Sequence, residues 1–168
     1  MDQRTLDNIA TLIPAAQEKA REFIAAVEES NRLPEGWRVS IISGLRSYEQ
    51  QDVLYQQGRA TPGPIVTNAP AGYSNHNFGT AFDIGIFNAA GRYIDDLPDR
   101  GLMFESEVSH YYRLLAPIGK ALGLIWGGDW ESIDDEPHYE LNLWAEMTEQ
   151  ERLAKLRALH DAGEAIGR

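Results

Sequence analysis

Two spacings of apolar residues alternate along the chain and predict a mixture of helices and short strands. Apolar residues recur at helical spacing over 14–29 and 106–122, with a shorter apolar stripe over 6–13. Alternation of apolar residues with small or polar ones marks 37–42 and 81–86 as strands, and a short apolar run marks 124–126. The stretch 138–141 also reads as a strand. We therefore expect an α+β fold, in which a small antiparallel sheet is flanked by helices.

Local signals predict where several helices begin and end. Ser47 with Gln50, and Thr148 with Glu151, have the spacing of a capping box, so helices are expected after each pair, the second covering about 149–162. Pro117 lies inside the predicted helix 106–122, which should therefore kink or divide into two short helices. Glycines and prolines over 62–72 predict an irregular loop.

Composition limits the classes of protein that are possible. The 168 residues are 43% hydrophobic, enough for one domain over 1–168 with a substantial core. A net charge of −11 with dispersed acids argues against a nucleic-acid partner, and the absence of cysteine excludes disulfides and thiolate ligands. No apolar run approaches the ~20 residues that span a bilayer. The acids Asp95, Asp96 and Asp99 do not have EF-hand spacing and predict a solvated loop.

The stretch 74–83 carries the clearest candidate chemistry. Asp83 is predicted on one face of a buried strand, with His76 in the loop before it, folding back over that face. We expect the small residues Gly79, Ala81 and Gly85 to keep space open there. Zn²⁺ usually takes three protein ligands and leaves one position for water, so His138 is the candidate for the third. This N,N,O set suits Zn²⁺, which can lower the pKa of a bound water to about 7.

A hydrolase also needs a proton acceptor and a group that stabilises an oxyanion. Asp135 lies three residues before His138, but Asp134 and Glu136 are neighbours of the same charge, so spacing alone does not decide between them. Arg46, at a predicted strand end, is the candidate cation. It could instead pair with an acid.

The motif SxHxxGxAxD at 74–83 resembles that of the zinc peptidases that include D-alanyl-D-alanine carboxypeptidases and L-alanyl-D-glutamate endopeptidases, a group that shares its fold with the hedgehog signalling domain. Stretches at 43–59, 127–130 and 135–140 also resemble the endopeptidase branch, so the resemblance covers about 37–141. It implies that His76, Asp83 and His138 bind one zinc ion. It also implies that Asp135 is the general base and that Arg46 faces the substrate carbonyl.

Other residues in these motifs have a functional and a structural reading. Ser74 either contacts substrate or caps the loop that presents His76, and Asp129 and Trp130 either line the pocket or belong to a turn and the core. Gln50 or its neighbour Gln51 is expected beside the substrate. Glu140 is not among the predicted site residues, and it could either orient a ligand imidazole or pair with an arginine. His110 and His160 are expected on the surface without partners.

The resemblance implies hydrolysis of peptidoglycan stem peptides, with the L-alanyl-D-glutamate bond preferred. Dipeptidases of the family carry Glu where this chain has Asp135, which argues against that activity. A D-alanyl-D-alanine carboxypeptidase and a non-catalytic binding module on the same fold are the alternatives; a mere binder would need neither Asp135 nor Arg46.

The N-terminal residues lack a basic region followed by an apolar run, so no signal peptide is expected. We expect a monomer that stays in the cytoplasm until it is released to the wall, as in phage lysis. The alternative is a wall or periplasmic enzyme that arrives by another route.

Overall fold

The computed structural model describes residues 1–94, 105–131 and 134–166. The acids Asp95, Asp96 and Asp99 therefore lie outside the described residues. The elements follow the order α1 (Gln3–Ala10), α2 (Pro14–Ser30), β1 (Arg38–Ser43), α3 (Tyr48–Gln56), η1 (Asn75–Phe78), β2 (Ala81–Phe87), α4 (Glu105–Ala121), β3 (Leu124–Trp126), η4 (Gly127–Asp129), β4 (His138–Leu141) and α5 (Glu149–Asp161), where η marks a short 3₁₀ helix.

The strands form one antiparallel sheet in the order β1-β2-β4-β3. β2 is a central strand, since it lies between β1 and β4. Its alternate side chains Phe82, Ile84 and Ile86 are fully buried, as the alternation predicts. β4 pairs with β2 although more than 50 residues separate them, and Asp83 faces His138 across this pair. Asp83 and His138 thus lie on adjacent antiparallel strands.

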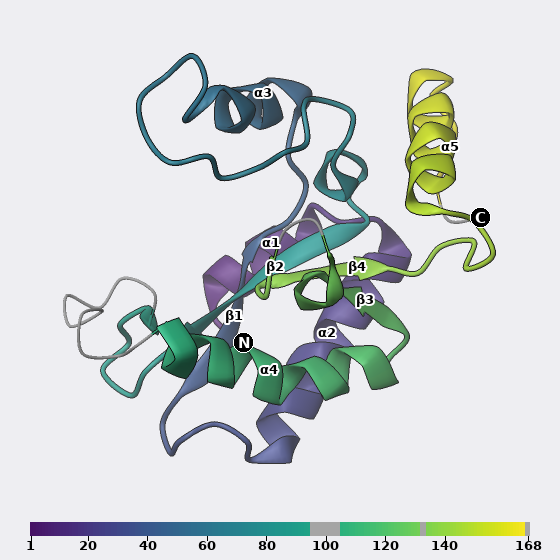
Figure 1. The fold of residues 1–168 in the computed structure, drawn as a ribbon. Helices are drawn as coiled ribbons and strands as arrows, with labels where there is room; N and C mark the ends of the chain where they lie inside the picture. The colour runs from purple at the N-terminus through teal and green to yellow at the C-terminus, as the bar shows by residue number, and fades with distance from the viewer. Residues whose placement is uncertain (95–104, 132–133, 167–168) are drawn as a thin grey trace.

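The main core lies between the sheet and the helices α1, α2 and α4. α1 and α2 pack against β1, and α4 packs against β3 and α2. Phe23, Ile24 and Leu115 are among its fully buried side chains. In Figure 1 the sheet crosses the middle of the view, with α2 and α4 below it and α3 and α5 above it.

A smaller core packs α5 against η1. Leu153 and Leu156 of α5 are buried with Phe78 of η1, and Tyr48 of α3 packs against them. α5 contacts η1, the element that contains His76. The C-terminal helix is thus packed against the segment that presents a candidate ligand.

The predicted capping boxes are confirmed, since Ser47 with Gln50 and Thr148 with Glu151 make both reciprocal bonds. Of the two outcomes predicted at Pro117, the division of 106–122 is wrong, because α4 is one helix that contains Pro117, and the kink stays a prediction. Packing of α4 against α2 and β3 holds the helix together across the missing N–H. No helix in the described parts of the chain combines the length and the hydropathy needed to cross a bilayer.

Candidate active site

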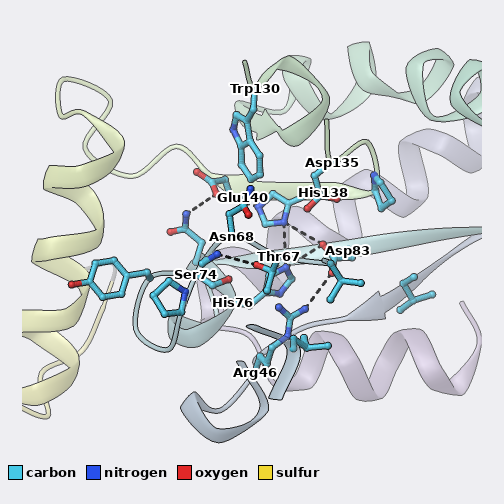
Figure 2. A pocket seen from close by; sticks show the side chains of 18 of the residues that line it. Arg46, Thr67, Asn68, Ser74, His76, Asp83, Trp130, Asp135, His138 and Glu140 are labelled. Carbon is cyan, nitrogen blue, oxygen red and sulfur yellow. Dashed lines mark hydrogen bonds and ion pairs between the residues drawn. The ribbon is translucent and has the colours of Figure 1, made fainter. Parts of the chain in front are cut away.

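Two histidines and an aspartate converge at one point above the sheet (Figure 2). His76 Nε2 lies 3.1 Å from Asp83 Oδ1 and 3.2 Å from His138 Nδ1, and the last two atoms are 3.2 Å apart. The three residues come from η1, β2 and β4. His76 and His138 are almost fully buried, and the Asp83 side chain is 18% exposed. The structure therefore assembles the predicted ligand set.

The turn before β2 places His76. η1 ends at Gly79, whose φ of +65° is unfavourable for residues with a side chain. A Cβ at Gly79 would also lie 3.2 Å from the backbone nitrogen of Ile13. Likewise, a Cβ at Gly85 would lie 2.7 Å from Ile42. The expectation that these glycines keep space open is wrong, because neighbouring segments fill that space and only glycine permits their approach.

Hydrogen bonds on the far side of each imidazole determine which nitrogen carries the proton. His76 Nδ1 lies 2.8 Å from the carbonyl oxygen of Gly44, which can only accept, so Nδ1–H donates there. His138 Nε2 lies 3.1 Å from Glu140 Oε2, which accepts from Nε2–H. In the neutral rings, His76 Nε2 and His138 Nδ1 then carry lone pairs that face each other and the Asp83 carboxylate. Three electron-pair donors that face one another without a proton between them form a site that favours a cation.

The spacing of these donors suits a small divalent ion. Ligand atoms that surround Zn²⁺ tetrahedrally at about 2.0–2.1 Å lie roughly 3.3 Å from one another. The observed separations are 3.1–3.2 Å. Within the described residues, His76, Asp83 and His138 form a group whose ligand atoms lie close enough to share one ion. The donor set therefore fits the zinc ion implied by the sequence.

Electrostatics at this point also favour a positive charge. Burial by itself would raise the pKa of Asp83, but the two imidazoles hold it well below its usual value. Burial would lower the pKa of His138, whereas hydrogen bonds and charges from Asp83 and Glu140 raise it to about 10. The pocket thus stabilises an ionised carboxylate together with a nearby cation.

Asp135 and Asp134 have different surroundings. Asp135 lines the cavity beside His138, and burial, followed by the charge of Asp83, raises its pKa. Asp134 points outward, with its side chain 57% exposed and 3.5 Å from Arg113. Arg113 also donates to Glu136 at 2.7 Å, which turns that third acid away from the site. Of the three neighbouring acids, Asp135 is placed to exchange protons in the cavity.

Gly127 allows this placement of Asp135. The carbonyl oxygen of Gly127 accepts from the backbone N–H of Asp135 at 3.3 Å. A Cβ on Gly127 would lie 2.5 Å from the carbonyl oxygen of Asp135 and 3.0 Å from the Cβ of His138. Gly127 belongs to the motif at 127–130, but nothing in the sequence indicated that Asp135 and His138 approach it this closely.

Arg46 lies on the opposite side of the three convergent residues from Asp135 (Figure 2). Its Nη2 is 3.7 Å from Asp83 Oδ2, and its Nη1 donates to Gln51 Oε1 at 2.9 Å. Gln51 is fully buried and donates in turn to the carbonyl oxygen of Ala69 in the cavity wall. The guanidinium is thereby held at the cavity surface, where a substrate oxygen could reach it, and the Arg46 side chain as a whole is 19% exposed.

Two residues expected beside the substrate lie elsewhere. The Gln50 side chain is exposed, accepts from the backbone N–H of Ser47 in the capping box, and does not line the cavity around Asp83. Gln51, the adjacent residue, takes the expected place. Asp129 pairs with Lys120 at 2.5 Å and does not line that cavity either. Neither residue lines that cavity, and the substrate-binding roles expected for Gln50 and Asp129 stay predictions.

The remaining predicted residues surround the convergent donors. Ser74 and Trp130 both line the cavity, which has a volume of about 570 Å³. The Trp130 ring lies 4.8 Å from the ring of His138, at the cavity edge seen in Figure 2. Thr67 and Asn68, from the irregular loop, also line the cavity and had no distinguishing signal in the sequence.

The expected pairing of Glu140 with an arginine is confirmed, since it forms an ion pair with Arg152. Glu140 also contacts the imidazole of His138, and its role in orienting that ring stays a prediction. His110 is exposed, as expected. His160 is exposed too, but it has partners: its ring stacks on Tyr48 at 5.1 Å and meets Phe78 edge-on. It belongs to the contact between α5 and α3.

Comparison with known proteins agrees with this site. The sequence profile of a family described as D-alanyl-D-alanine carboxypeptidase matches residues 67–141. The matched segment contains His76, Asp83, Asp135 and His138. The resemblance to this peptidase family is confirmed. The match begins after α3, so Arg46, which lies between β1 and α3, is outside its range.

The chain is also similar in sequence to a bacterial enzyme. The chain is 41% identical over 106 residues to the peptidoglycan L-alanyl-D-glutamate endopeptidase CwlK of Bacillus subtilis, a match that covers 63% of this chain. The chain spans 62% of the length of CwlK.

Two solved structures show the shared fold. The Serratia marcescens L-Ala D-Glu endopeptidase ChiX matches with a TM-score of 0.55 and 20% identity, over 84% of this chain and 88% of ChiX. The vancomycin-resistance D,D-pentapeptidase VanY, solved with Zn(II), matches with a TM-score of 0.51 and 16% identity, over 92% of this chain and 80% of VanY. The expected α+β fold of the D-Ala-D-Ala peptidase type is confirmed.

Proposed function

We propose that this chain is a zinc peptidase that hydrolyses peptidoglycan stem peptides, with the bond between L-alanine and D-glutamate as its target. The observation that carries the proposal is the convergence of His76 Nε2, Asp83 Oδ1 and His138 Nδ1 at 3.1–3.2 Å in a cavity that Asp135 and Arg46 also line. The choice of bond rests on the 41% identity to CwlK.

His76, Asp83 and His138 are the proposed ligands. Two neutral imidazoles and one carboxylate leave a net charge of +1 on a bound divalent ion, and three ligands leave a position for water. The ion supplies Lewis acidity, which makes water a better nucleophile and polarises a carbonyl group. Gly44 and Glu140 hold the two rings in the tautomers that this role requires.

Asp135 is proposed as the general base and acid. Its carboxylate takes a proton from the attacking water as the oxygen–carbon bond forms, and returns it to the leaving amine nitrogen as the carbon–nitrogen bond breaks. The raised pKa of Asp135, caused first by burial, brings the carboxyl closer to neutral pH, where such an exchange is efficient.

Arg46 is proposed to stabilise negative charge on the oxygen of the scissile carbonyl. Its guanidinium lies across the donors from Asp135, so a substrate carbonyl between them meets both groups. The bond to Gln51 fixes this orientation before substrate arrives, which reduces the reorganisation needed in the transition state. Ser74 and Trp130 are proposed to contact the substrate backbone and side chains.

Digestion of purified peptidoglycan, followed by mass analysis of the fragments, tests the proposal. We expect a new N-terminal D-glutamate and retention of L-alanine on the glycan. Release of terminal D-alanine would support the alternative D-alanyl-D-alanine carboxypeptidase, towards which the family description points. Binding to peptidoglycan without any fragment would favour a non-catalytic module and contradict the proposal.

We propose that the enzyme acts at the cell wall as a monomer. Cytoplasmic accumulation before release, as expected from the sequence, stays a prediction. Expression with and without permeabilisation of the inner membrane would test it, since lysis is expected only with permeabilisation.

A further inference from the structure

Glu140 is a buried carboxylate beside the proposed zinc site, and it has three partners. The residue is 2% exposed. Its Oε2 accepts from Asn75 Nδ2 at 2.6 Å and from His138 Nε2 at 3.1 Å, while its Oε1 lies 3.6 Å from Arg152 Nη2. These partners come from η1, β4 and α5. Glu140 therefore connects the C-terminal helix to an imidazole that faces the site.

Arg152 is well placed to orient this carboxylate. Its side chain is only 13% exposed, and its Nη1 donates to the carbonyl oxygen of Met147 at 3.2 Å, so both ends of the guanidinium are engaged. Within the described residues, the ion pair that Glu140 makes with a basic side chain is the one with Arg152. A buried carboxylate that loses its cationic partner is costly and tends to reorient or attract water.

The packing of α5 holds Arg152 at this distance. Leu153 and Leu156 are three residues apart, on one face of α5, and both are buried against Phe78. Phe78 is two residues from His76, so α5 contacts the segments of both histidines: η1 by apolar packing and β4 through the ion pair.

We propose that Arg152 is a positioning residue that sets the zinc affinity of the site through Glu140. Arg152 holds Glu140 Oε1, so that Oε2 faces His138 Nε2–H. This bond in turn aims His138 Nδ1 at the metal position. The inference rests on the proposed function, because it concerns the same ion. It assigns to α5 a role in metal binding, beyond covering the core.

Zinc affinity, measured by competition with a chromogenic chelator, tests this inference independently of hydrolysis. Arg152→Met keeps the apolar stem and removes the guanidinium, and Glu140→Gln keeps the shape and removes the charge. We expect each to weaken zinc binding by about 10- to 100-fold, the usual effect of losing a residue that orients a ligand. Arg152→Lys should recover part of the loss.

The matched control is Lys155→Met. Lys155 lies on the same helix and carries the same charge, but its ammonium lies over the Trp144 ring, 3.9 Å from the centroid. We expect its zinc affinity to equal that of the wild type. Equal losses in Lys155→Met and Arg152→Met would reduce the effect to general electrostatics and overturn the inference.

The double variant separates positioning from simple destabilisation. If Arg152 acts through Glu140, Arg152→Met should cause little further loss in the Glu140→Gln background. Additive losses, or unchanged affinity in Arg152→Met, would overturn the inference while leaving the proposed function intact. Wild-type zinc binding without hydrolysis would contradict the proposed function but not the affinity comparison. A wild type that binds no zinc would overturn both.

Discussion

Asp83 and His138 are direct partners across the β2–β4 pair, and Asp83 Oδ1 lies 3.2 Å from His138 Nδ1. Two candidate ligands are thus held by the hydrogen bonds of the sheet, which position backbone more rigidly than a loop does. His76 is brought to the same point by η1. The predictions below follow from this arrangement.

Removing a ligand should abolish metal binding and leave the fold in place. His76→Ala takes one of three donors, while the main core is formed without this side chain. We expect no stoichiometric zinc by elemental analysis, no hydrolysis, and a wild-type circular dichroism spectrum. His110→Ala, which changes an exposed histidine, should retain zinc and activity. Full zinc occupancy and activity in His76→Ala would refute the site assignment.

Replacing the proposed base should separate chemistry from metal binding. Asp135→Asn should keep zinc and lower kcat by roughly 10²–10⁴, the usual contribution of general acid–base catalysis. Asp134→Asn is the control, because that carboxylate points outward to Arg113. Kinetics of peptide hydrolysis measure both. A harmless Asp135→Asn with a damaging Asp134→Asn would reverse the assignment.

Arg46→Ala should lower kcat by about 10²–10³ if its guanidinium stabilises the oxyanion. Zinc should stay bound, because Arg46 contacts only the outer oxygen of Asp83, at 3.7 Å. A rise in KM with unchanged kcat would instead indicate that Arg46 binds substrate and transition state equally. Gln50→Ala is a suitable comparison, since it should affect the start of α3 and not turnover.

Gly127→Ala should displace the turn that presents Asp135. The new methyl group would meet the Asp135 carbonyl oxygen at 2.5 Å, so the backbone must shift. A displacement of about 1 Å can cost on the order of 10²-fold in rate. We expect a similar loss of kcat, together with weaker zinc binding, because the Cβ of His138 lies 3.0 Å away. Wild-type kinetics would show that the turn adjusts without moving Asp135.

Asp2 should contribute to stability only above acidic pH. Its carboxylate caps α1 through the N–H of Thr5 and accepts from Ser40. Partial burial acts to raise its pKa, but these hydrogen bonds lower it to about 2. The folded pKa is thus below the unfolded value of about 3.9, so the contribution is complete above that value and disappears as pH falls towards 2.

Asp2→Ala should therefore lower the free energy of unfolding by roughly 0.5–2 kcal/mol at pH 7, with a smaller difference near pH 2.5. Denaturant titrations at both pH values measure this. Asp7→Ala, an exposed acid on the same helix, should change the free energy by less than about 0.5 kcal/mol. A difference that stays constant with pH would show that the charge of Asp2 does not matter.

Features that depend on residues a few positions apart could be predicted from the sequence. The capping boxes at Ser47 and Thr148 and the alternation in β2 are local patterns, and the structure has them. His76 and Asp83 belong to one such motif. His138 lies 55 residues beyond Asp83. The need of zinc for a third protein ligand made it a candidate, and the resemblance, whose motifs retain information about distant contacts, supported that choice.

Tertiary packing distinguishes neighbours with the same chemistry, which local spacing did not. Gln51 rather than Gln50 reaches Arg46, because capping uses Gln50 and the next residue of a helix points about 100° away. Asp135 rather than Asp134 enters the cavity, because Gly127 and Arg113 approach from other segments. Contacts of this kind join segments far apart in the chain. No local spacing encodes them, and the same holds for the contact between Arg152 and Glu140.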